Sequence, residues 1–178
     1  FGMASGASVL TAQYWGKGDR KAIEKIMGIV LGFSLLAGLL FMFITLLFTE
    51  QIMSLFTKDA NVIAEGSTYL KIVAYTFPMV AFSMSYLNMI RSIEKVVIST
   101  VVYGISLILN FIINYILIFG QFGIEPMGIK GAAIGTLCAR FFEVVVVLLY
   151  GNFKLKEVGI IPKYMIFMDK ILLKDFLK

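Results

Sequence analysis

Long stretches without a charged residue constrain this chain more than any other feature of its sequence. Four such runs occupy residues 26–48, 72–90, 96–124 and 131–150, the last with a single basic and a single acidic residue. About 20 consecutive apolar residues in a helix are enough to cross the hydrocarbon core of a bilayer. The runs therefore predict several membrane-spanning helices.

The composition supports the same prediction. Hydrophobic residues make up 60% of the 178 residues and charged residues only 15%, whereas soluble domains carry about 25% charged residues. We predict an all-α, polytopic transmembrane helix bundle. Its expected spans are 1–15 (partial), 26–49, 69–90, 96–119 and 131–150. The first span is short and begins without a flank, so we expect the chain to be a fragment of a longer membrane protein.

Several classes of function are disfavoured by what the sequence lacks. The only cysteine is Cys138, and there is no histidine, so neither an internal disulfide nor a Cys/His metal cluster can form. No nucleophile triad, phosphate loop or nucleic-acid module is present. We expect neither an enzyme nor a nucleic-acid-binding protein, and no cofactor.

The basic residues predict an orientation in the membrane. Twelve of the sixteen fall in the segments 16–25, 91–95 and 151–178. Positive charge marks the cytoplasmic side of membrane proteins, so we place these segments in the cytoplasm and the chain in a plasma membrane of the bacterial inner-membrane type. The tail 151–178 suits either a helix along the membrane interface or an amphipathic linker packed on protein.

Polar side chains inside the span 96–119 form a stripe. Tyr103, Ser106, Asn110 and Asn114 follow one another at steps of three, four and four, which places them on one face of a helix. Unpaired amides are costly in hydrocarbon, so the stripe faces either another helix or a water-filled cavity. The first alternative makes the amides interhelical glue.

The span 131–150 carries a second polar face. Thr136, Arg140 and Glu143 lie at i, i+4 and i+7, and the two charges are expected to neutralise one another. The alternative is that Glu143 carries a proton. Thr136 lies at about the same depth as Asn114, so the oxygens of Asn110, Asn114 and Thr136 could together hold a cation or order water. Asn88 sits near the cytoplasmic end of its span, and Pro78 predicts a kink in the same span.

Four pieces of the sequence, in order, resemble the multidrug and toxic compound extrusion (MATE) family. They are "TAQYWGKGD" (11–19), "YLNMIRS" (86–92), "NFIINYILIFGQFGIEPMGIKGAAIGT" (110–136) and the charged tail "KILLKDFLK" (170–178). The resemblance covers nearly the whole chain, and the block 110–136 is its most specific part.

The resemblance implies a fold and a mechanism. MATE transporters have twelve helices in two six-helix lobes and exchange Na⁺ or H⁺ for cationic drugs, so the five spans would be helices two to six of the first lobe. Asn110, Asn114 and Thr136 would line the outward-facing cavity of that lobe, and Asn88 would match a substrate-contacting amide. The tail 151–178 would be the cytoplasmic link to a second lobe. Some members carry aspartate at the position of Asn114, and an amide cannot titrate there.

Three functions follow as hypotheses. The first is a cation-coupled antiporter that exports drugs or other organic, mostly cationic, compounds, with Na⁺ or H⁺ as the coupling ion. The second is a lipid-linked-sugar flippase of the same superfamily, which would need several basic residues in its cavity. The third is a structural membrane subunit whose polar stripes are only helix glue.

Overall fold

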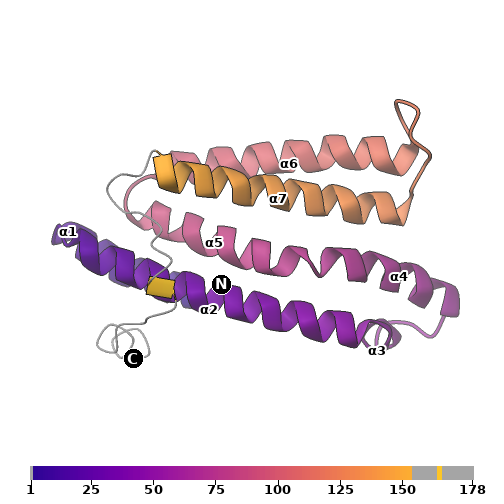
Figure 1. Cartoon of the computed structure of the whole chain (residues 1–178), viewed down its shortest axis with the longest axis horizontal. Helices are drawn as coiled ribbons and strands as arrows, with labels where there is room; N and C mark the ends of the chain where they lie inside the picture. Colours follow the sequence, from indigo (N-terminus) through magenta and orange to yellow (C-terminus); the bar gives the residue numbers. More distant parts are fainter. Residues whose placement is uncertain (1, 154–163, 166–178) are drawn as a thin grey trace.

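The computed structural model describes residues 2–153 and 164–165, and all of the regular structure in this part is helical. Seven helices follow one another within residues 2–153 (Figure 1). They are α1 (Gly2–Gly16), α2 (Arg20–Leu47), α3 (Thr49–Ser54), α4 (Ala60–Val73), α5 (Thr76–Ser92), α6 (Val96–Phe119) and α7 (Ile129–Phe153).

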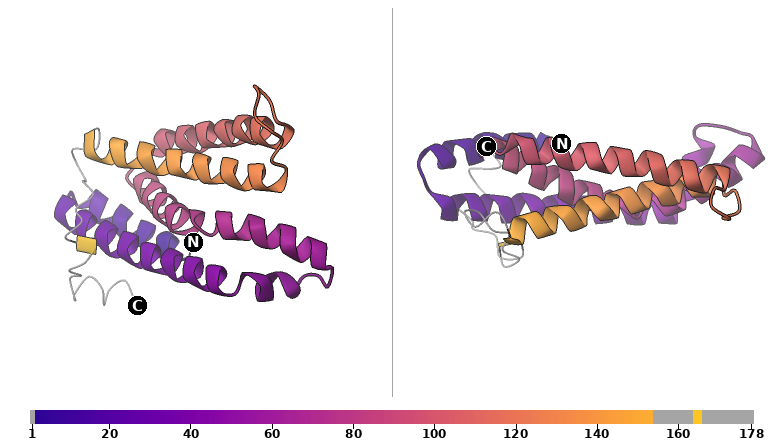
Figure 2. Two further views of the ribbon diagram at one scale, coloured as in Figure 1. Left: turned by 45° about the vertical axis from the view of Figure 1, so that its right-hand side comes forward. Right: turned by 90° about the horizontal axis from the view of Figure 1, so that it is seen from above.

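The long helices lie side by side in a bundle (Figures 1 and 2). The helix α2 packs on α5, and α6 packs on α7. The helices α4 and α5 lie between α2 and the pair of α6 and α7, and both contact α7. The helix α1 contacts α2 and α5. The side chains in the core around this junction are large and apolar, among them Ile23, Met27, Leu31, Leu87 and Ile90.

Within the described residues, three helices are long and apolar enough to cross a membrane: α2, α6 and the stretch Ile129–Gly151 of α7. The pair α4 and α5 makes a fourth span if the two are counted together. The helix α6 buries Ser99 and Ser106 and exposes Val97, Leu107 and Phe111. This distribution of polar and apolar side chains is the opposite of that on a helix of a water-soluble protein. An apolar outer face is the arrangement that lipid requires. The predicted all-α membrane bundle is confirmed.

The expected span 69–90 is not one helix with a kink at Pro78. Its residues are divided between α4 and α5, which meet at an angle of 48°. Proline cannot donate a backbone hydrogen bond, and its ring clashes with the carbonyl four residues earlier, which here is that of Ala74. The Ala74 carbonyl instead accepts from the backbone N–H of Phe77 at 3.1 Å. Pro78 therefore stands in the first turn of α5, and the break lies before it.

The cytoplasmic tail predicted for 151–178 lies mostly outside the described residues. The helix α7 continues to Phe153, and residues 164–165 return to α2. A side chain at Gly28 would collide with Tyr164, and one at Gly32 with the backbone oxygen of Met165. This pair of glycines thus leaves room for a returning segment of the chain.

Candidate functional site

Three of the polar side chains selected from the sequence meet between α6 and α7. The amide nitrogen of Asn114 donates to Oδ1 of Asn110 at 3.2 Å, and the amide nitrogen of Asn110 donates to Oγ1 of Thr136 at 3.4 Å. The Thr136 hydroxyl in turn donates to the carbonyl of Ala132 at 2.9 Å. We call Asn110, Asn114 and Thr136 the amide cluster. Its side chains are half-buried.

One oxygen of the amide cluster has no partner. Oδ1 of Asn114 is buried and accepts no hydrogen bond from the described residues. It points at Gly135 of α7, where the Cβ of any larger residue would collide with it. A buried acceptor without a donor costs about 1–3 kcal/mol. Such an oxygen is suited to receiving a cation or a donor that comes from elsewhere.

A second cluster centres on Glu143 of α7, whose exposed fraction is 0%. Its carboxylate accepts from Ser83 Oγ of α5 at 2.5 Å, from Ser106 Oγ of α6 at 3.2 Å, and from Arg140 Nη1 of α7 at 2.7 Å. The last contact is an ion pair, as expected from the i,i+3 spacing. Glu143 therefore connects three helices at one point, and we call these four residues the carboxylate cluster.

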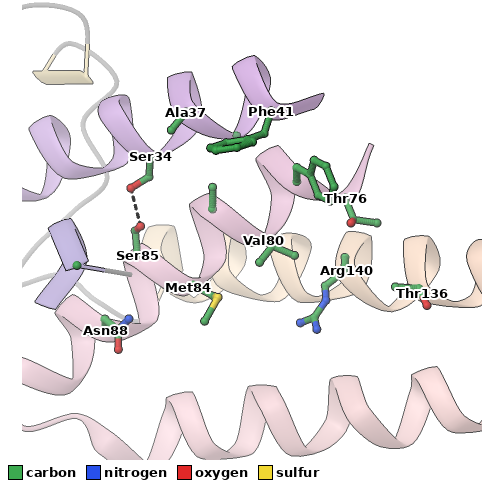
Figure 3. Close-up of a pocket in the computed structure, with 14 residues that line it drawn as sticks. Ser34, Ala37, Phe41, Thr76, Val80, Met84, Ser85, Asn88, Thr136 and Arg140 are labelled. Atoms are coloured by element: carbon green, nitrogen blue, oxygen red, sulfur yellow. Dashed lines mark hydrogen bonds between the residues drawn. The ribbon is translucent and has the colours of Figure 1, made fainter. Parts of the chain in front are cut away.

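A cavity of about 830 Å³ lies between α2, α5 and α7 (Figure 3). Its wall is mostly apolar and includes Phe41, Val80 and Met84. The polar residues on the wall are Ser34, Thr76, Ser85, Asn88, Thr136 and Arg140. This volume and this mixture of an apolar wall with a few polar groups are typical of a pocket for a small organic molecule.

The two clusters meet the cavity through α7. Thr136 and Arg140, one helical turn apart, stand on its wall (Figure 3). Thr136 also belongs to the amide cluster and Arg140 to the carboxylate cluster. One face of α7 thus connects both polar clusters with the space that could hold a molecule.

Comparison with known proteins identifies the family. A model described as MatE matches residues 1–116. The chain belongs to the MatE family. This confirms the resemblance to multidrug and toxic compound extrusion proteins, and this MatE chain is a multi-pass membrane protein.

Curated relatives are longer than this MatE chain. It is 28% identical over 151 residues to the probable multidrug resistance protein YoeA of Bacillus subtilis, covering 84% of this chain and 32% of the relative. It is 36% identical over 103 residues to the multidrug export protein MepA of Staphylococcus haemolyticus, covering 58% of this chain and 22% of the relative. The chain thus spans about a third or less of the length of these relatives.

Solved MATE structures share the fold of the chain. A MATE protein in the bent conformation superposes with a TM-score of 0.87 at 18% identity, over 99% of this chain and 38% of that one. An outward-facing MATE transporter superposes with a TM-score of 0.85 at 18% identity, again over 99% of this chain and 38% of the other. The arrangement of helices is therefore that of part of a MATE protein.

The structure divides the residues selected from the sequence into groups. Thr136, Arg140 and Asn88 line the cavity of the MatE chain, whereas Asn110 and Asn114 lie beside it between α6 and α7. Ser106 and Glu143 belong to the buried carboxylate cluster. Tyr103 belongs to neither cluster. The guanidinium carbon of Arg91 lies 5.6 Å from the centroid of its ring.

Sequence reasoning missed the wall of the cavity that α2 forms. Ser34 of α2 and Ser85 of α5 share a hydrogen bond of 2.7 Å at the edge of this cavity (Figure 3). Phe41 lines the cavity from the same face of α2. A serine inside an uncharged run is a weak signal, because its hydroxyl can bond to its own helix. Only the packing of α2 against α5 singles out this pair.

Proposed function

We propose that this chain forms part of a secondary transporter that exports organic, mostly cationic, compounds in exchange for Na⁺ or H⁺. The observation that carries the proposal is the 830 Å³ cavity, whose wall shares Thr136 with the amide cluster. The relatives YoeA and MepA, whose names describe a probable multidrug resistance protein and a multidrug export protein, support the same activity. The activity is binding and transport, without enzymatic chemistry and without a bound cofactor.

The amide cluster is the proposed site of the coupling ion. Oδ1 of Asn114 accepts no hydrogen bond from the part of the chain that the structure describes, and Oδ1 of Asn110 and Oγ1 of Thr136 lie next in the same chain of hydrogen bonds. Amide and hydroxyl oxygens are hard ligands of the kind that Na⁺ binds. An ion bound there would be separated from a substrate in the cavity only by the side chain of Thr136, because Thr136 belongs to the amide cluster and also lines the cavity. Binding energy of the ion can then bias the conformational equilibrium of the transporter.

The proposed function also implies a membrane, an orientation in it and a second lobe. The protein works in a lipid bilayer of the bacterial inner-membrane type, with segments 16–25, 91–95 and 151–178 on the cytoplasmic side. A second lobe of the same polypeptide, joined through 151–178, completes the transport path. The charged side chain on the cavity wall is Arg140, which is paired with Glu143. One paired arginine among the described lining residues favours the exporter over a flippase of phosphate-linked lipids, which needs several free basic groups.

Transport by the full-length protein tests the amide cluster. Asn110→Ala and Asn114→Ala should each lower ion-driven efflux from proteoliposomes about tenfold or more, since either change removes an oxygen from the proposed site. Na⁺ and H⁺ gradients are applied separately, so that the gradient that drives efflux identifies the ion. Asn61→Ala is the matched control, because Asn61 is exposed on α4. Unchanged efflux in both cluster variants would rule out this site.

Cysteine labelling distinguishes a transporter from a structural subunit. The exposed Cys138 is first replaced by serine, and Asn88→Cys and Thr136→Cys are introduced singly in the full-length protein. Both positions line the cavity, so a membrane-impermeant maleimide should modify them, and a saturating substrate should protect them. Leu107→Cys, on the exposed apolar face of α6, should stay unmodified because it faces lipid. Lack of modification at both cavity positions would favour the helix-glue interpretation.

A further inference from the structure

Arg140 places a positive charge on the wall of a cavity that is proposed to accept cations. Its side chain is 36% exposed and lines the cavity from α7 (Figure 3). A fixed cation at this place would repel a cationic substrate. The charge that a substrate experiences therefore depends on what compensates Arg140.

The compensating group is Glu143, behind the wall. It is fully buried and does not line the cavity, yet its Oε2 lies 2.7 Å from Nη1 of Arg140. Hydrogen bonds from Ser83 and Ser106 hold the carboxylate in place from α5 and α6. Arg140 and Glu143 thus face the cavity as a pair without net charge.

We propose that Glu143 is a positioning residue that sets the charge selectivity of the cavity. It fixes the guanidinium of Arg140 on the wall and cancels its charge, so that cationic organic compounds are admitted without contact between Glu143 and the substrate. The inference rests on the proposed function, since it concerns the same cavity. It adds a residue that controls which substrates bind, and that acts from a position behind the cavity wall.

The size of the effect follows from Coulomb's law. A cation about 8 Å from an uncompensated Arg140 would be disfavoured by roughly thirtyfold in affinity at an effective dielectric constant near 20. A molecule of the same shape without net charge would be affected far less. The signature of the mechanism is therefore a change in the ratio of two affinities.

The test measures binding of two matched dyes to the purified full-length protein in nanodiscs. Tetramethylrhodamine methyl ester is a cation, and tetramethylrhodamine, its free acid, is a zwitterion with the same ring system. Fluorescence anisotropy gives the Kd of each dye for the wild type and for Glu143→Gln, Arg140→Gln and the double variant. The net charge of the side chains at positions 140 and 143 is zero in the wild type, plus one in Glu143→Gln, minus one in Arg140→Gln and zero in the double variant.

We expect the ratio of the ester Kd to the acid Kd to rise about tenfold or more in Glu143→Gln. It should fall below the wild-type ratio in Arg140→Gln and return close to it in the double variant. Glu65→Gln, an exposed residue of α4, removes one negative charge elsewhere and should leave the ratio unchanged. Should Glu143→Gln not fold, the opposite shift in Arg140→Gln and its reversal in the double variant carry the test.

Two failures are distinguishable. A wild type that binds both dyes, with a ratio that does not follow the charge of the pair, would overturn this inference and leave the proposed function in place. A wild type that binds neither dye, and drives no efflux of the ester in proteoliposomes, would overturn the proposed function and this inference with it.

Discussion

Replacing Glu143 with alanine should destabilise the folded protein by about 3–5 kcal/mol, which is the usual cost of removing one partner of a buried ion pair. The carboxylate has no exposed surface, and three donors from three helices converge on it. Without it, Arg140 loses its ion-pair partner, and Ser83 and Ser106 lose an acceptor. Thermal unfolding of the full-length protein in detergent, followed by tryptophan fluorescence, measures the loss.

Smaller substitutions around the same carboxylate provide reference values for this loss of stability. Ser83→Ala and Ser106→Ala each remove one hydrogen bond to a charged group, worth about 1.5–3 kcal/mol. Glu65→Ala changes an exposed glutamate of α4 and should shift stability by less than about 0.5 kcal/mol. If Glu143→Ala unfolded at the same temperature as Glu65→Ala, the carboxylate cluster would not hold the three helices together.

Gly131→Ala should destabilise the contact between α6 and α7 by about 1–3 kcal/mol, the range for overpacking a closely packed site. A Cβ at Gly131 would lie 2.7 Å from the carbonyl oxygen of Leu117 and 2.8 Å from its carbonyl carbon. Both are backbone atoms of α6, so the clash is relieved only if the helices separate. Separation would also weaken the bond of 3.4 Å between Asn110 and Thr136, and ion-driven efflux should fall with stability.

The matched control for this change is Gly104→Ala in the middle of α6. A Cβ there would meet nothing within 4 Å, and alanine favours a helix over glycine by about 0.8–1 kcal/mol. Gly104→Ala should therefore leave stability unchanged or raise it, while Gly131→Ala lowers it. Shifts of the same sign and size in the two variants would contradict the close approach of α6 and α7.

Local spacing was enough to predict some relationships within the candidate site. Arg140 and Glu143 are three residues apart on one helix, and the ion pair expected from that spacing is present at 2.7 Å. Asn110 and Asn114 are four residues apart, and their amides are joined at 3.2 Å. Both contacts lie within a single helix, whose geometry follows from its period of 3.6 residues. That these residues bind an ion or a substrate stays a prediction.

Contacts between helices could not be derived in the same way. Nothing local indicates that Ser83 and Ser106, from two other helices, converge on Glu143. The stripe on α6 divides between neighbours, since Asn110 contacts α7 while Tyr103 lies by Arg91 of α5. Such contacts depend on how irregular helix surfaces fit together, for instance where Gly135 leaves room for the amide of Asn114.

The sequence alone determined that this chain is a bundle of membrane helices, because long uncharged runs can satisfy their backbone groups in lipid only by internal hydrogen bonds. It also determined the pairing of charges along α7. Only the tertiary structure decided where the cavity lies, which side chains of α2 and α5 face it, and that Glu143 lies behind its wall. The physical reason is that hydrogen bonding within a helix depends on neighbours in sequence, whereas a cavity exists only where side chains of separate helices fail to fill the space between them.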